Sequence, residues 1–88
     1  MEQQNASSSV SGPNGRALTL DDLPPPSITR WVTRRKAEVV AAVQGGLLTV
    51  EDALERYGLS EEEFTGWQRL YSAHGTKGLR ATRLQQYR

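Results

Sequence analysis

The side chains that could do chemistry in this sequence are cationic, because the residues that most enzyme sites need are scarce. His74 is the only histidine, and the 88 residues include no cysteine. A conventional zinc site, a Cys–His pair or a Ser–His–Asp triad therefore cannot be assembled from one chain. His74 lies at a predicted helix end, where a capping role is expected. We expect no enzyme activity, no metal or other cofactor, and no small-molecule substrate.

The charges are segregated along the chain, although the net charge is only +1. Residues 1–28 carry one cation and three acids, and residues 29–44 carry four cations and one acid. Residues 45–66 carry one cation and six acids, whereas residues 67–88 carry five cations and no acid. This pattern predicts a dipolar molecule whose basic segments favour a polyanionic partner such as double-stranded DNA.

No part of the sequence predicts a membrane span or a secretion signal. No apolar run approaches the roughly 18 residues that a span needs. The first residues, MEQQNASSSVSG, lack the basic start and apolar stretch of a signal peptide. We expect a cytoplasmic, nucleoid-associated protein. Dimerisation would help a domain this small, but the sequence does not require a homodimer.

The elements that position the charged residues fall into three segments. Residues 1–28 are rich in Ser, Asn, Gln and Gly and are predicted to be a disordered arm whose few apolar residues cannot form a core. The prolines at 24–26 give the arm an extended end that no helix can cross. Residues 29–75 are predicted to be the folded domain. Residues 76–88 are a basic tail, for which a short helix and an extended arm both remain open.

The folded domain is predicted to be all-α, with three helices or, counting the tail, four. The first helix begins at Ser27 or Thr29 and ends at the glycine pair 45–46. Helical spacing predicts an apolar stripe on it, made by Val32, Val39 and Val43 with Lys36 between them.

Two shorter helices follow, each with clear capping signals. The second begins after Thr49, which forms a capping box with Asp52, and Gly58 ends it. The third begins after Ser60, for which a capping box with Glu63 is expected, and ends at residues 74–75.

The short turn at residues 58–60 makes these two helices cross steeply, which predicts a helix-turn-helix. Leu59, Phe64 and Trp67 then take its inward positions, while Leu54 stands where such motifs commonly have a smaller residue. A three-helix core with no docking role would show the same apolar pattern, so this geometry does not by itself define a function.

The charges of the third helix do not suit the usual docking of a helix-turn-helix. Its N-terminal residues would enter the major groove, but Glu61 and Glu62 would repel phosphates there. Most DNA affinity must therefore come from the basic flanks, and the two glutamates are candidate contacts for a protein partner. The candidate DNA-binding residues are Arg30, Arg34, Arg35, Lys36, Ser60, Thr65, Arg69, Lys77, Arg80, Arg83 and Arg88.

The segment 23–88 closely resembles a small alphaproteobacterial family, the SciP family of CtrA inhibitory proteins, long described as a domain of unknown function. The resemblance rests on LPPP, RWVTRRKAEVVAAV, GGLLT, ERYGLS, the Phe64–Trp67 pair and the closing TRLQQYR. It implies a helix-turn-helix domain similar to the Trp repressor that restrains genes activated by the response regulator CtrA.

Two functional hypotheses follow. The leading one is a DNA-binding transcriptional regulator, acting as a repressor or antagonist of CtrA-activated genes. The alternative is a protein-interaction module that binds the response regulator or the transcription machinery and has no DNA affinity of its own.

Overall fold

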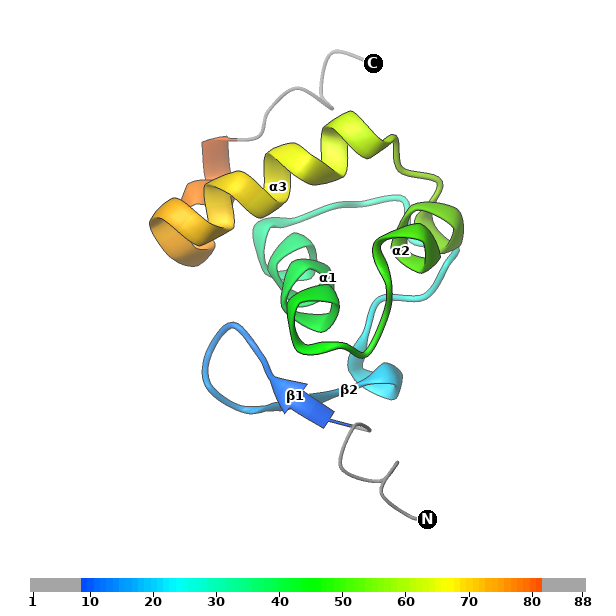
Figure 1. Ribbon diagram of the computed structural model, residues 1–88, viewed down its shortest axis with the longest axis horizontal. Helices are drawn as coiled ribbons and strands as arrows, with labels where there is room; N and C mark the ends of the chain where they lie inside the picture. Colours follow the sequence, from blue (N-terminus) through cyan, green and yellow to red (C-terminus); the bar gives the residue numbers. More distant parts are fainter. Residues whose placement is uncertain (1–8, 82–88) are drawn as a thin grey trace.

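A computed structural model describes residues 9–81, which form three α-helices with a small hairpin and two short 3-10 segments (Figure 1). The expected all-α class is confirmed, and the hairpin is an addition to it. The elements are β1 (Ser9–Ser11), β2 (Ala17–Thr19), η2 (Leu20–Asp22), α1 (Thr33–Gly45), α2 (Val50–Tyr57), α3 (Glu61–His74) and η3 (Gly75–Ala81).

The predicted capping signals explain the bounds of α2 and the start of α3. The Thr49 hydroxyl accepts from the Asp52 amide at 3.0 Å, and the Asp52 carboxylate accepts from the Thr49 amide at 3.3 Å. Gly58 ends α2 with φ 64°, a left-handed conformation that glycine adopts at little cost. The Ser60 hydroxyl caps α3 by accepting from the amide of Glu63 at 3.0 Å. These local interactions set the two helices of the motif.

The helix-turn-helix crossing is visible in Figure 1, where α2 is seen nearly end-on while α3 runs across the page. Phe64 and Trp67 are buried at the inward positions of α3, and Leu59 packs partly buried from the turn. The predicted inward residues therefore do form the core of the motif.

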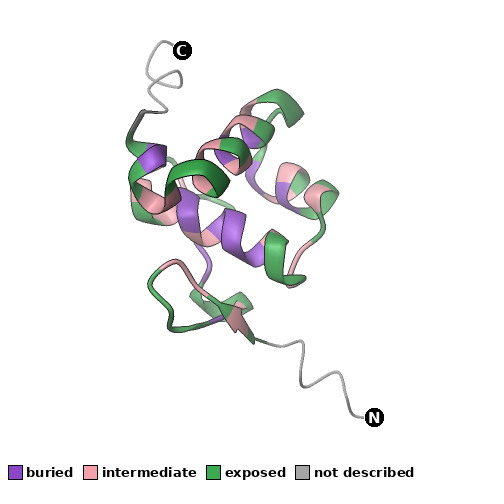
Figure 2. Cartoon of the chain, turned by 60° about the vertical axis from the view of Figure 1, so that its left-hand side comes forward, coloured by how far each residue is buried: buried purple, intermediate pink, exposed green. Residues whose placement is uncertain are grey.

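Helix α1 lies between the helix-turn-helix and the hairpin, and it is buried on both sides (Figure 2). A helix that is apolar around most of its circumference belongs in the centre of a fold. The main core is made of Ala37, Val39, Val40, Ala53, Tyr57, Phe64, Trp67 and Leu79.

The first helix starts later than expected, at Thr33 and not at Ser27 or Thr29. The chain after the prolines makes a turn, in which the Ile28 amide donates to the Pro25 carbonyl at 3.0 Å. It then stays extended while Ile28 and Trp31 pack against the core. Because these two side chains pack against the core from an extended segment, α1 begins only at Thr33.

The prediction of a disordered arm over residues 1–28 is wrong for residues 9–28, while residues 1–8 lie outside the described part. Strands β1 and β2 pair antiparallel, with Val10 opposite Leu18. Leu18 and Leu23 are buried against Ala41 and Ala42 of α1, in a second core cluster. The few apolar residues of the arm do form a core, because α1 supplies the other half of it.

The tail, left open by the sequence, continues as the 3-10 segment η3 up to Ala81, and residues 82–88 lie outside the described part. Leu79 is only 1 % exposed and joins the main core. Gly78 lies so close to α3 that an added Cβ would stand 2.6 Å from the Leu70 carbonyl oxygen. Between residues 9 and 81, no helix combines the length and apolar character needed to cross a membrane.

Candidate nucleic-acid interface

The first turn of α1 presents two arginines that share one carboxylate. Arg35 Nη1 donates to Glu38 Oε1 at 3.1 Å, and Arg34 Nε lies 3.9 Å from Glu38 Oε2. The Arg34 side chain is 71 % exposed, whereas that of Glu38 is only 14 % exposed. One carboxylate cannot neutralise two guanidinium groups, so this turn keeps a net positive charge that faces solvent.

Lys36 was expected to contact DNA, and the structure contradicts this. The residue is only 3 % exposed, and its Nζ lies 5.6 Å from the ring centroid of Trp67. Burial lowers the pKa of Lys36 below 10.5, and the negative charge of Glu63 partly opposes this shift. Lys36 is the fourth residue of α1 and lies on the side of the helix that faces Trp67, so its side chain packs in the core and is not exposed to a phosphate.

Arg16 is a candidate contact that the sequence interpretation missed, because it was assigned to a disordered arm. It follows the hairpin loop, where Gly12 N donates to Arg16 O at 2.7 Å and Arg16 N donates to Asn14 Oδ1 at 3.2 Å. The five residues between the strands, 12–16, include Pro13, Asn14 and Gly15, which are turn formers typical of a longer hairpin loop. That signal could have revealed the hairpin.

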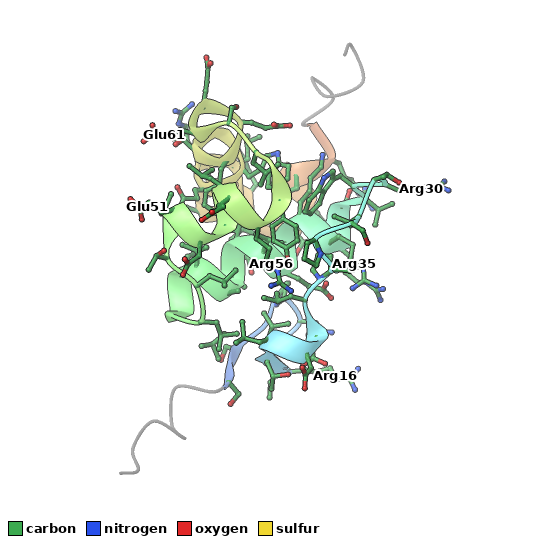
Figure 3. All side chains as sticks on the ribbon, turned by 90° about the vertical axis from the view of Figure 1, so that its right-hand side faces the viewer. Arg16, Arg30, Arg35, Glu51, Arg56 and Glu61 are labelled. Atoms are coloured by element: carbon green, nitrogen blue, oxygen red, sulfur yellow. The ribbon has the colours of Figure 1, made fainter. Side chains whose placement is uncertain are left out.

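Four arginines form a surface that we call the arginine face and define as Arg16, Arg30, Arg34 and Arg35. Figure 3 shows Arg16, Arg30 and Arg35 along one edge, with Glu51 and Glu61 at the opposite edge. Arg34 belongs with them because it lines the same groove as Arg16. Arg16 and Arg30 form no ion pair with any other residue of the described range. Arg16, Arg30 and Arg35 therefore lie apart from Glu51 and Glu61 in space, although Arg16 comes from a segment with more acids than cations.

Where the arginine face meets the hairpin, the surface is hollowed into a groove of about 410 Å³. The hairpin loop, the start of α1 and the start of η3 form its walls, and Arg16, Arg34, Glu38 and Thr76 are among the residues that line it. Three segments far apart in the sequence therefore meet at this groove.

The remaining candidate residues lie on α3 and η3. Ser60, Thr65 and Arg69 are exposed on the helix-turn-helix, and Lys77 and Arg80 are exposed on η3. Arg83 and Arg88 lie outside the described residues. Glu61 and Glu62, the candidate contacts for a protein partner, are exposed in the first turn of α3.

The candidate DNA-binding residues do not form one surface. Glu61, in the first turn of α3, lies on the side of the molecule away from the arginine face (Figure 3). The structure brings Arg30, Arg34 and Arg35 together and leaves Ser60 and Thr65 on a different element. In residues 9–81, no group of three His, Cys, Asp or Glu side chains could hold a metal ion.

Comparisons with known proteins place the chain among uncharacterised relatives. A family described as protein of unknown function (DUF1153) matches residues 2–88. A Rhodobacter sphaeroides protein solved by NMR is 50 % identical, with a TM-score of 0.70 over 91 % of this chain and 84 % of that one. A second NMR structure, a structural genomics target, is 41 % identical, with a TM-score of 0.64 over 100 % of this chain and 87 % of that one. A search of curated proteins finds no match.

Proposed function

The chain belongs to the DUF1153 family, and from its surface we propose that it is a DNA-binding transcriptional regulator that docks through the arginine face. The observation that supports this most strongly is the gathering of Arg16, Arg30 and Arg35 on one side, with Glu51 and Glu61 on the other. Phosphate contacts by arginine supply most of the sequence-independent affinity of DNA-binding proteins.

The same separation of charge argues for an unusual docking mode. In the common mode, the first turn of the second helix of the motif enters the major groove. In this protein that turn carries Glu61, Glu62 and Glu63, which would face the polyanion while the arginine face pointed to solvent. We therefore propose that α1 and the hairpin face the DNA and that α3 serves as a structural helix.

The start of α1 is well suited to contact a phosphate backbone. Val32 gives no side-chain cap, and the first turn contains no acidic residue. The free amides and the positive end of the helix dipole therefore add to the charge of Arg34 and Arg35. Cations at this end of a helix repel the dipole, and a docked anion relieves that repulsion.

The resemblance of residues 23–88 to the SciP family supports a finer version of the proposal. In this version the protein restrains genes that the response regulator CtrA activates, by occupying promoter DNA beside the activator. It would then act in the cytoplasm, on the nucleoid, as a monomer or as a homodimer.

A salt series with a duplex promoter fragment tests the DNA-binding proposal by fluorescence anisotropy. If the arginine face engages three to four phosphates, log K falls with log salt at a slope of about −2.7 to −3.6. Replacing Arg34 and Arg35 together by Ala weakens binding by about 1–3 kcal/mol. The matched control is Arg69→Ala: Arg69 was a candidate contact from the sequence, but this docking mode turns α3 away from the DNA, so its loss leaves binding nearly unchanged. Absent or salt-independent binding at low salt would contradict the proposal.

The acidic surface supports a second candidate function, a protein-interaction module that binds a basic face of the response regulator. Glu51, Asp52, Glu61 and Glu62 are exposed in the first turns of α2 and α3. Reversing charge with Glu61→Lys and Glu62→Lys together would then abolish binding to the response regulator without unfolding the domain. If the same variant instead retains that binding, this second function is wrong.

A further inference from the structure

The groove between the hairpin and α1 has the features of a site for a phosphoryl group, which the functional proposal above does not assign. It measures about 410 Å³, within the usual range of ligand pockets. Two guanidinium groups line it from different elements, Arg16 from the hairpin and Arg34 from α1. Guanidinium groups recognise phosphoryl oxygens through paired N–H donors, so two arginines that line one groove suit an anion.

Two carboxylates also line the groove, and both are already engaged by protein groups. Glu38 accepts from Arg35 and lies close to Arg34. Asp22 accepts from the Thr19 amide at 2.9 Å and from the Thr19 hydroxyl at 3.0 Å. Arg16, by contrast, forms no ion pair within residues 9–81. Arg16 is therefore available to a ligand, and Arg34, which shares the single Glu38 carboxylate with Arg35, keeps donors that Glu38 does not engage.

The arginine on the hairpin is held in place before any ligand binds. Both backbone groups of Arg16 are hydrogen-bonded within the loop, to Gly12 N and Asn14 Oδ1. The hairpin is in turn seated on α1, since Val10 packs against Gly45 so closely that no Cβ would fit there. The ordered backbone removes the loop's share of the entropy cost of binding, so only the exposed Arg16 side chain has to become ordered.

We infer that this groove binds a phosphoryl group, with Arg16 and Arg34 as its cationic ligands and Thr76 as a hydroxyl donor. The inference rests on the proposed DNA binding when the phosphoryl group is a backbone phosphate of a duplex. A free phosphate or nucleotide offers the same chemistry. The groove contact carries no sequence information, because a phosphate looks the same beside every base.

The test compares the full chain with Arg16→Ala on two duplexes of unrelated sequence across a salt series. Losing one phosphate contact weakens binding to both duplexes by the same factor, about three- to tenfold, and makes the salt slope shallower by about 1. Arg69→Ala is the matched control, and thermal unfolding confirms that Arg16→Ala stays folded. Because Arg16 and Arg34 hold one group, Arg34→Ala costs less affinity in the Arg16→Ala background than in the original chain.

A second arm separates the two sources of the phosphoryl group. Inorganic phosphate is titrated into the labelled protein while amide shifts of residues 12–17 and Thr76 are followed by NMR. If the chain binds no duplex but phosphate shifts these amides, and Arg16→Ala removes the shifts, the groove stands and the DNA-binding proposal fails. If the chain binds duplex and Arg16→Ala changes neither affinity nor slope, the groove inference is overturned while DNA binding survives. If neither ligand binds, both are overturned.

Discussion

At the scale of single residues, Tyr57 ties the segment before α1 to the helix-turn-helix. Its hydroxyl donates to the Pro24 carbonyl at 2.7 Å and accepts from Arg56 Nε at 3.1 Å. Its ring packs edge-on against Trp31, with the ring centroids 5.2 Å apart. The buried hydroxyl therefore holds a chain segment that lies 33 residues away in the sequence.

We predict that Tyr57→Phe lowers the free energy of unfolding by about 1–2 kcal/mol, because a buried carbonyl loses its donor. Burial raises the pKa of Tyr57 above 10.0, so the phenol loses its proton at a lower pH in the unfolded chain than in the folded one. Stability of the original chain therefore falls as the pH rises above 10, and this component is absent in the variant. Denaturant melts over pH measure both effects. Tyr71→Phe is the control, since the Tyr71 hydroxyl makes no hydrogen bond within residues 9–81. An equal loss in both variants would contradict the prediction.

Lys36 gives the opposite dependence on pH. Burial lowers its pKa below 10.5, so the unfolded chain holds the proton more tightly and stability rises as the pH approaches 10.5. We predict that Lys36→Met removes this rise and changes stability at neutral pH by less than about 1 kcal/mol, since relief of desolvation offsets the lost attraction to Trp67 and Glu63. Lys77→Met, at an exposed lysine, keeps the rise. Duplex affinity of folded Lys36→Met stays unchanged, and a loss of affinity would restore Lys36 as a DNA contact.

At the scale of elements, the seating of the hairpin depends on a glycine at the end of α1. A Cβ on Gly45 would stand 2.5 Å from Val10 Cβ, so Gly45→Ala must push the hairpin away. We predict a loss of about 1–3 kcal/mol on overpacking. The matched control is Gly66→Ala in α3, where nothing lies within 4 Å of the added Cβ, and it gains about 0.5–1 kcal/mol of helix stability.

Thermal unfolding of both glycine variants checks this prediction. Val10→Gly in the Gly45→Ala background restores part of the loss, because it removes the colliding Cβ together with both methyl groups. Equal stability of the two single variants would mean that the hairpin does not rest on α1.

The elements that could be predicted from the sequence are those whose ends are set by neighbouring residues. The Thr49–Asp52 capping box of α2 formed as predicted, whereas the box expected for α3 is only half formed: the Ser60 hydroxyl accepts from the Glu63 amide, and the Glu63 carboxylate does not complete the box. The start of α1 and the fold of residues 9–28 depend on partners far along the chain, such as Tyr57 for Pro24. Composition alone made that segment resemble a disordered arm.

In the candidate site, too, features set by neighbouring residues could be predicted, whereas those that depend on tertiary packing could not. Helical spacing placed Lys36 within the apolar stripe, yet Lys36 was also counted among the DNA contacts, and its position beside Trp67 shows that the stripe was the better guide. Arg16 was missed because its importance comes from where the hairpin packs, which is a tertiary property.

At the scale of the whole molecule, the account depends on opposite faces of opposite charge. The arginine face is built by α1, the hairpin and the segment before α1, whereas the first turns of α2 and α3 supply the acids (Figure 3). Such a molecule is oriented by the field of a polyanion, so that its acids point away from the DNA. The acidic first turns would then remain accessible to a basic protein bound beside it.

Amide shift mapping by NMR with a duplex promoter fragment tests this orientation most directly. The account predicts that the largest changes in amide chemical shift fall on residues 12–17 and 30–38, while the shifts of residues 50–65 change little. Shifts concentrated at Ser60 to Thr65, with the arginine face unchanged, would contradict it and return α3 to the role of a recognition helix.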